Sequence, residues 1–175
     1  DHMKAALLMS HGFNDWNVMP EHSYRIYKAA KEKGLPTQIY YHQNGHGGPP
    51  PISMMNRWFT KYLHGIDNGV EKEENKAYIV REYDDRLEPT AYKDYPNPDA
   101  SDVLLNLSYS RKSIGDLTHT KGTEAEEMFS DDASISRSDH AKATSSKNRL
   151  LYVTPKLKEA LHISGVPKVT VTLSS

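Results

Sequence analysis

KAALLMS at Lys4–Ser10 and QIYYH at Gln38–His42 decide the fold, because each is a short, apolar or β-rich run that ends at a polar loop. Such runs are typical of strands in the interior of a parallel sheet. Between them, Pro20 opens a stretch with apolar residues at helical spacing, which ends at Gly34. The order strand, helix, strand predicts a parallel βαβ unit whose two loops leave the same edge of the sheet.

A second helix is predicted directly after this unit. Its apolar residues recur at helical spacing as Met54-Met55, Trp58-Phe59 and Tyr62-Leu63. We expect this helix to pack on the sheet and to end at Gly65. The charged run Glu71–Lys76 follows, and the change in composition predicts a domain boundary near residue 70.

The remainder, residues 71–175, has short strand candidates separated by turn residues. These candidates are Ala77–Tyr83, Val103–Leu107, Leu150–Val153 and Val169–Leu173. Several short strands with turns between them are typical of an antiparallel β-sandwich. Thr118–Asn148 is crowded with polar residues, so we expect a long surface connection there.

Composition excludes several classes of function. With 22 Lys and Arg against 23 Asp and Glu, the formal net charge is -1, which provides no field to attract nucleic acid or an anionic membrane. Cysteine is absent, so disulfides, thiolate metal sites and a cysteine nucleophile are excluded. The longest apolar run, Ala5–Met9, is too short to span a bilayer. We expect no nucleic-acid or membrane partner, and a cytoplasmic location with export left open.

The two predicted loops carry the candidate catalytic residues. Asp15 lies in HGFNDWNV after the first strand, and His46 lies between glycines after the second. Loops beyond the carboxyl ends of parallel strands converge, so the carboxylate and the imidazole should lie close together. An imidazole that acts as a general base needs a carboxylate to fix its tautomer. The pattern therefore predicts an acid and base pair.

Each of these residues also has a simpler interpretation. Asp15 can cap its own loop or the following helix, and His46 can be a loop histidine bonded to backbone. His42 and His46 are four residues apart, which suggests zinc, but Asn44-Gly45 interrupts any helix between them and we expect no metal. Trp16, beside the acid, is the candidate for substrate contact.

The string HGFNDWNV, followed by a helix and HQNGHGGP, resembles the acid and histidine loops of α/β-hydrolases, most closely the Xaa-Pro dipeptidyl-peptidase and cocaine esterase family. This resemblance implies that Asp15 is the triad acid and His46 the base. It extends over nearly the whole chain, through segments similar to the family's jelly-roll domain: Tyr95–Pro98, Phe129–Asp132, Arg149–Pro155 and Ile163–Val169. The implied fold is α/β, with the C-terminal part of an α/β-hydrolase domain at 1–70 and a partial jelly-roll β-sandwich at 71–175.

The sequence departs from that family at the nucleophile. A serine hydrolase of this kind needs a G-x-S-x-G elbow upstream of the acid. Leu8–Gly12 contains Ser10 but lacks the first glycine. His46-Gly47-Gly48 is similar to an esterase oxyanion signature, but no serine elbow follows it. We therefore expect a fragment of a longer enzyme, cut at both ends and inactive alone.

The resemblance implies a serine peptidase that releases N-terminal Xaa-Pro dipeptides. Its partners would be a peptide with proline at the second position and the rest of the same enzyme chain, with no cofactor; a homo-oligomer is compatible with this hypothesis. One alternative is an esterase or acylase of the cocaine esterase type. Another is a non-catalytic β-sandwich interaction module in which Asp15 and His46 are relics, and a large distance between these side chains would favour it.

Overall fold

The computed structural model of the chain describes residues 2–81, 84–110 and 114–174. These residues form two compact units. Unit 1 comprises Asp1–Ala100 and Ser164–Ser175, and unit 2 comprises Ser101–Ile163. The domain boundary that the sequence predicts near residue 70 stays a prediction.

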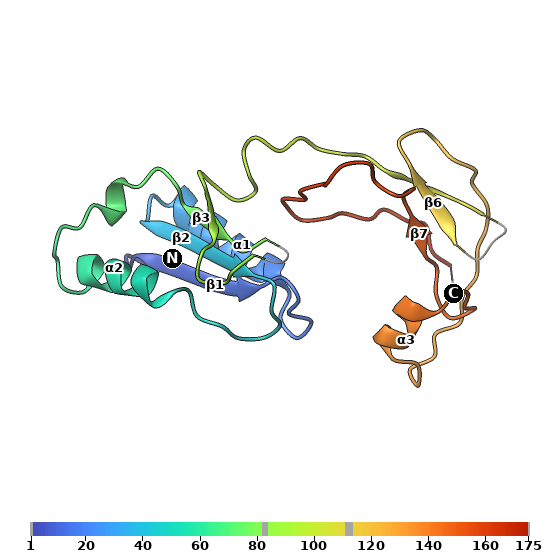
Figure 1. Cartoon of the computed structure of the whole chain (residues 1–175), viewed down its shortest axis with the longest axis horizontal. Helices are drawn as coiled ribbons and strands as arrows, with labels where there is room; N and C mark the ends of the chain where they lie inside the picture. The colour runs from blue at the N-terminus through green and yellow to red at the C-terminus, as the bar shows by residue number, and fades with distance from the viewer. Residues whose placement is uncertain (1, 82–83, 111–113, 175) are drawn as a thin grey trace. The chain divides into compact units, whose positions relative to one another are not determined.

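Unit 1 is built on a four-stranded mixed sheet in the order β1-β2-β3-β4. Strands β1 (Leu7–Gly12), β2 (Thr37–His42) and β3 (Ala77–Ile79) are parallel, and β4 (Thr90–Tyr92) runs antiparallel to β3. Helix α1 (Pro20–Glu32) connects β1 to β2, which completes the predicted βαβ unit (Figure 1). The predicted strand Ala77–Tyr83 is shorter, since β3 ends at Ile79 and residues 82–83 lie outside the described residues.

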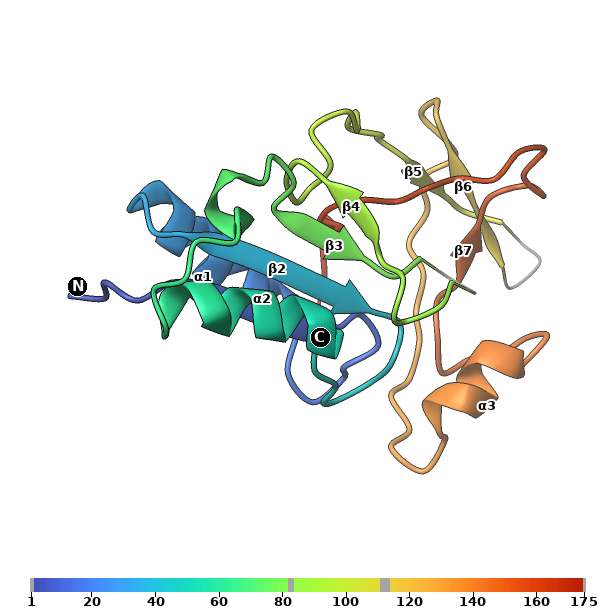
Figure 2. The same cartoon turned by 60° about the vertical axis from the view of Figure 1, so that its left-hand side comes forward.

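Strand β2 is the centre of unit 1, because all six of its residues are buried. Side chains alternate between the two faces of a strand. Ile39 and Tyr41 join the apolar core with Tyr27 of α1 and with Tyr95. Helix α2 (Ile52–Tyr62) covers the opposite face from α1 (Figure 2) and buries Trp58 against Tyr62, with ring centroids 4.5 Å apart. The sheet is therefore held between two helices, which fixes its strand ends.

Two segments far apart in the sequence meet in unit 1. The Tyr95 hydroxyl donates to the Gly165 carbonyl at 3.0 Å, and the Asn97 N–H donates to the Ser164 hydroxyl at 2.9 Å. The following stretch, Val169–Leu173, was predicted to be a strand, and this prediction is wrong because these residues form no strand. Alternating Val and Thr favour extended backbone, but a strand also requires a neighbour to receive its hydrogen bonds.

Unit 2 is organised around one small sheet of three strands. β5 (Asn106–Ser108) is antiparallel to β6 (Gly115–Thr118), and β7 (Tyr152–Val153) is parallel to β6. The long polar connection between β6 and β7 includes one short helix, α3 (Arg137–Lys142), whose N-terminus is capped by the Ser136 hydroxyl. The predicted antiparallel pairing is confirmed for β5 with β6 and is wrong for β6 with β7, and the jelly-roll sandwich stays a prediction.

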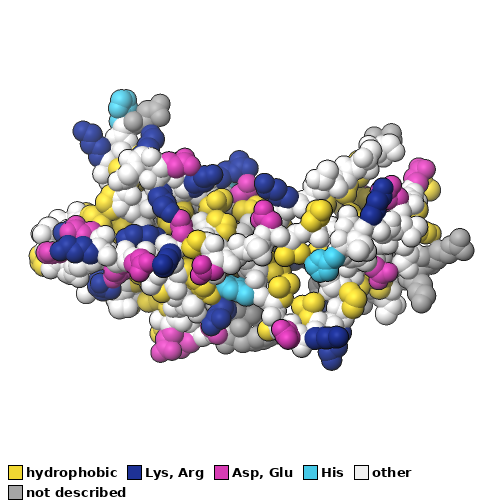
Figure 3. All heavy atoms as spheres, turned by 90° about the horizontal axis from the view of Figure 1, so that it is seen from above, with side chains coloured by type: hydrophobic (Ala, Val, Ile, Leu, Met, Phe, Trp, Pro, Cys, Tyr) yellow, Lys and Arg dark blue, Asp and Glu magenta, His cyan; other side chains and the backbone are white. Residues whose placement is uncertain are grey.

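The surface carries charged and apolar side chains side by side, as the space-filling view shows (Figure 3). In unit 2, large apolar side chains with more than half of their area exposed include Leu104, Met128 and Ile163. None of the helices in the described ranges is both long and apolar enough to cross a bilayer.

Candidate active site

The acid loop and the histidine loop lie side by side at the carboxyl ends of β1 and β2. The Phe13 N–H donates to the His42 carbonyl at 2.7 Å, and the Asn14 N–H donates to the Asn44 carbonyl at 3.3 Å. The Asn14 side chain adds a hydrogen bond from Nδ2 to the Gln43 carbonyl at 2.5 Å. These bonds continue the parallel pairing past the strands, so the two loops are fixed as one structure.

Gly12, at the end of β1, allows this close approach. A Cβ added at Gly12 would lie 2.1 Å from the Asn44 carbonyl oxygen and 2.4 Å from that of Gly45. Both atoms belong to the backbone, so no side-chain rotation could relieve the clash. Only glycine at this position allows the histidine loop to lie against the acid loop.

Asp15 and His46 are brought together by these loops. The His46 Nδ1 atom lies 2.9 Å from Asp15 Oδ2, which is hydrogen-bond distance. The carboxylate is buried, with Asp15 4% exposed, whereas 66% of the His46 side chain is exposed. The buried acid can orient the imidazole while the other side of the ring remains open to a reactant.

The Asp15 carboxylate accepts four hydrogen bonds. Oδ1 accepts the backbone N–H groups of Asn17 and Val18, at 2.9 and 3.0 Å, while Oδ2 faces His46 and His11. The Val18 N–H contributes most to lowering the pKa of Asp15 to about 2, against the opposing effect of burial, and His46 and Asn17 add to the lowering. Asp15 is therefore ionised at neutral pH. Oδ1 caps the loop, as the simpler interpretation of Asp15 expects. Oδ2 faces His46, as the acid and base interpretation expects.

His11 is part of the site, and the sequence interpretation gave it no role. Its Nε2 lies 3.1 Å from Asp15 Oδ2 and 2.9 Å from the Val18 carbonyl oxygen, and its Nδ1 lies 2.5 Å from the Ser23 hydroxyl. Both partners of Nε2 are acceptors, so this nitrogen carries the proton and Nδ1 accepts from Ser23. His11 thus contacts Oδ2, the carboxylate oxygen that the Asn17 and Val18 N–H groups do not bind. The feature of the sequence that could have identified His11 is its position four residues before Asp15.

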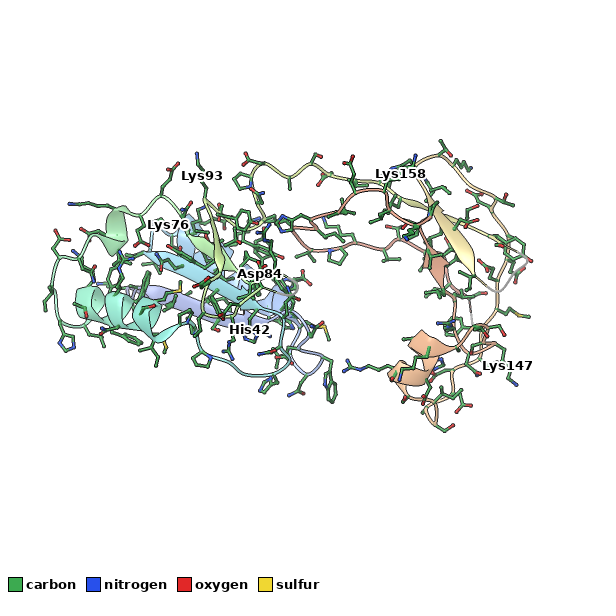
Figure 4. All side chains as sticks on the ribbon, viewed as in Figure 1. His42, Lys76, Asp84, Lys93, Lys147 and Lys158 are labelled. Carbon is green, nitrogen blue, oxygen red and sulfur yellow. The ribbon has the colours of Figure 1, made fainter. Side chains whose placement is uncertain are left out.

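Trp16 and His42 are not partners in the hydrogen bond between Asp15 and His46. Trp16 is 70% exposed, so its indole is open to a ligand but has no part in holding Asp15. His42 is buried at the carboxyl end of β2 (Figure 4), and its Nδ1 accepts the Asn44 N–H at 3.2 Å. Within residues 2–81, 84–110 and 114–174, no cluster of three His, Cys, Asp or Glu side chains is arranged to hold a metal ion.

Comparison with known families gives two matches along the chain. Residues 1–48 match the model described as X-Pro dipeptidyl-peptidase (S15 family). Residues 68–175 match the model described as X-Pro dipeptidyl-peptidase C-terminal non-catalytic domain. The first match contains both Asp15 and His46, and the second begins at residue 68, between α2 and β3.

Curated relatives are similar over almost the whole chain. A protein of Rhodopirellula baltica with the provisional name Xaa-Pro dipeptidyl-peptidase is 51% identical over 99% of this chain and 28% of its own length. A protein of Bacillus anthracis with the same provisional name is 32% identical over 97% of this chain and 29% of its own length. The Xaa-Pro dipeptidyl-peptidase of Pediococcus pentosaceus is 26% identical over 98% of this chain and 24% of its own length. The chain thus spans less than a third of these relatives.

Proposed function

The chain belongs to the X-Pro dipeptidyl-peptidase family, and we propose that it supplies the catalytic acid and base of a serine peptidase that releases N-terminal Xaa-Pro dipeptides. The observation that carries this proposal is the 2.9 Å contact between Asp15 Oδ2 and His46 Nδ1, with the acid buried and the ring exposed. This arrangement matches the chemical requirements of a general base held by a carboxylate. The non-catalytic interpretation, in which the two residues are relics, would lead us to expect separated side chains.

The contact assigns the tautomer of His46. Because Asp15 is ionised and can only accept, Nδ1 carries the proton in this contact and Nε2 retains its lone pair. Nε2 would take the proton of a serine hydroxyl as that oxygen attacks the carbonyl carbon of the proline residue. The resulting imidazolium is stabilised by the Asp15 carboxylate and gives its proton to the leaving amine, which leaves an acyl-enzyme. Water then releases the dipeptide by the same proton transfers.

The serine and the oxyanion-binding groups would come from other parts of the full-length protein, since the 175 residues contain no G-x-S-x-G elbow. We assign residues 1–70 to the C-terminal part of an α/β-hydrolase domain, supported by the βαβ unit and its two loops, and residues 71–175 to part of a jelly-roll domain. The exposed Trp16 beside the acid is proposed to contact the peptide. A cytoplasmic location is proposed with export left open, because a chain without cysteine fits a reducing compartment and exported proteins can lack cysteine as well.

The test is the substitution His46→Ala in the full-length enzyme, with hydrolysis of a chromogenic Xaa-Pro anilide as the measurement. We expect kcat to fall roughly a thousandfold or more, because the general base is lost. His64→Ala is the matched control: it removes an exposed histidine just after α2, and turnover should be unchanged. Near-normal turnover by His46→Ala would refute the role of this residue.

A second substrate separates the peptidase from the esterase alternative. The same preparations are assayed with a simple aryl ester that has no N-terminal amine. A peptidase should prefer the Xaa-Pro anilide, because its site must bind a charged substrate N-terminus. Hydrolysis of the ester alone would support the cocaine esterase type of activity, and hydrolysis of neither substrate would support the interaction module.

A further inference from the structure

The geometry points to Arg86, in the segment between β3 and β4, as a positioning residue that holds the histidine loop, residues 43–49, in the arrangement that catalysis requires. This inference rests on the proposed function, since it concerns the position of His46. Arg86 is far from both loops in the sequence, and it reaches the histidine loop because β3 extends the parallel sheet next to β2.

Arg86 is fixed at both its backbone and its side chain. Its carbonyl accepts the Tyr40 hydroxyl at 2.8 Å, and Tyr40 is completely buried in β2. Its Nη2 donates to the Pro49 carbonyl at 2.7 Å. The first bond fixes the residue on the sheet, and the second transmits that position to the histidine loop.

Gly48 shows how closely Arg86 packs against the loop. Gly48 has a φ of +124°, and an added Cβ would lie 2.5 Å from Arg86 Nη2 and 2.8 Å from His42 Nε2. The Ser10 hydroxyl donates to the Gly48 carbonyl at 2.6 Å. The end of the loop is therefore hydrogen-bonded by side chains from β1 and from the β3–β4 segment, and it packs closely against His42 of β2.

The end of the loop needs this support because it has no regular secondary structure of its own. Residues 43–49 contain no helix or strand, and Gly47 and Gly48 both have positive φ values. The His46 side chain is 66% exposed, with its hydrogen bond to Asp15 on one side of the ring. Displacement of the backbone at Gly48 would move Nε2 relative to the attacking hydroxyl, and an error of about 1 Å in such a position can cost roughly a hundredfold in rate.

The position of Arg86 gives part of the second family match a role next to the catalytic site. Arg86 lies within residues 68–175, which match the model described as a C-terminal non-catalytic domain. In this chain, however, β3 and the segment after it belong to unit 1, together with the acid and the base. Part of the region matched by that model would therefore determine the catalytic geometry without touching substrate.

The experiment compares Arg86→Ala, Arg86→Lys and Arg81→Ala in the full-length enzyme with the same Xaa-Pro anilide. We expect Arg86→Ala to lower kcat roughly ten- to a hundredfold with KM within about twofold, because substrate contacts are unchanged. Added guanidinium ion should restore part of that kcat by occupying the vacated position beside the Pro49 carbonyl. Arg86→Lys, which keeps one donor, should be intermediate. Arg81→Ala removes an exposed arginine paired with Asp84 and should match wild type.

The outcomes separate this inference from the proposed function. His46→Ala is measured in parallel, and its retention of turnover would refute the proposed function itself. If His46→Ala is inactive but Arg86→Ala has normal kcat, the positioning role is wrong. A loss that guanidinium does not restore, or a rise in KM with a matching loss of thermal stability, would assign Arg86 a general structural role and also overturn the inference. Should Arg86→Ala fail to fold, Arg86→Lys and its kcat decide the question.

Discussion

The two units of this chain differ in how firmly their backbones are held. In unit 1, β2 is buried along all six residues and lies between two paired strands. In unit 2, Gly115 is the one buried residue among those that the structure describes. Apolar burial is the main favourable contribution to folding, so the local free energy of unfolding should be much higher around β2 than anywhere in unit 2.

The difference explains where a precise site can be built. The acid and histidine loops continue from buried strands and are joined by backbone hydrogen bonds such as that from Phe13 to His42. In unit 2, the long connection is held by a backbone bond from the Ser130 N–H to the Lys147 carbonyl at 3.0 Å and by side-chain bonds. Examples are Asn148 Nδ2 to the Ser130 carbonyl at 2.7 Å and the Arg149 guanidinium to the carbonyls of His140 and Ala143. Side-chain contacts at a surface permit more movement than a strand ladder. Similar changes should therefore have larger consequences in unit 1.

The sharpest test of this comparison places the same methyl group in both units. Gly12→Ala puts a Cβ 2.1 Å from a backbone carbonyl of the histidine loop, whereas Gly122→Ala puts one 2.3 Å from the side chain of Ser108. We expect Gly12→Ala to lower kcat roughly a hundredfold in the full-length enzyme, because the loop must move away from Asp15. Gly122→Ala should leave kcat within about twofold, since local movement in unit 2 can absorb the clash. Equal losses for both variants would contradict the comparison.

Residues that the sequence could predict share one property: their signal is local. The apolar run before His11 and the β-rich run before the histidine loop indicate parallel strands, and parallel strands bring their loops together. Asp15 and His46 could therefore be selected as a pair before any distance was known, and the distance is 2.9 Å. Their catalytic roles stay a proposal. The contact of Tyr95 with Gly165 shows the converse, since each motif was visible but their meeting was not.

The residues that sequence reasoning missed act across the fold. Arg86 reaches Pro49 through the pairing of β2 with β3, and no spacing along the chain indicates this contact. Strand β4 (Thr90–Tyr92) is too short to be recognised although Thr and Tyr favour strands, and β6 begins with Gly115-Asp116, which disfavour one. Val169–Leu173 gives the opposite error, because its pattern favours a strand for which the structure provides no partner. Pairing is a tertiary property, so local patterns neither ensure nor exclude it.

A second prediction compares the cores directly by making one substitution at two isoleucines. Ile39 in β2 is completely buried, and Ile163 in unit 2 is 77% exposed. Ile39→Ala should lower the free energy of unfolding by about 2–5 kcal/mol, through lost burial and the cavity that remains. Ile163→Ala should change it by less than about 0.5 kcal/mol. Urea unfolding of the chain, followed by tryptophan fluorescence and circular dichroism, measures both; a large effect of Ile163→Ala would show that unit 2 has a core of its own.

The smallest expected effect is on stability at low pH, and its test compares one carboxylate in each unit. The pKa of Asp15 is lowered from 3.8 to about 2, chiefly by the Val18 N–H, and that of Asp132 is lowered by the hydroxyl and N–H of Ser134. A carboxyl whose pKa is lower in the folded state stabilises it above the ordinary pKa, and this contribution is lost as the pH falls toward the folded pKa. Between pH 3.8 and about 2, the unfolded chain binds the proton first, so the wild-type protein should lose stability there.

Asp15→Asn should weaken this pH dependence, because the amide keeps the acceptor for the loop N–H groups but does not titrate. Both tryptophans, Trp16 and Trp58, lie in unit 1, so the fluorescence midpoint in urea reports on that unit. The midpoint of Asp15→Asn should fall less between pH 3.8 and about 2 than that of the wild type. Asp132→Asn should reproduce the wild-type fluorescence profile, since its carboxyl belongs to unit 2. If Asp132→Asn alters the profile as much as Asp15→Asn does, the two units unfold together, and the difference in their burial does not separate them energetically.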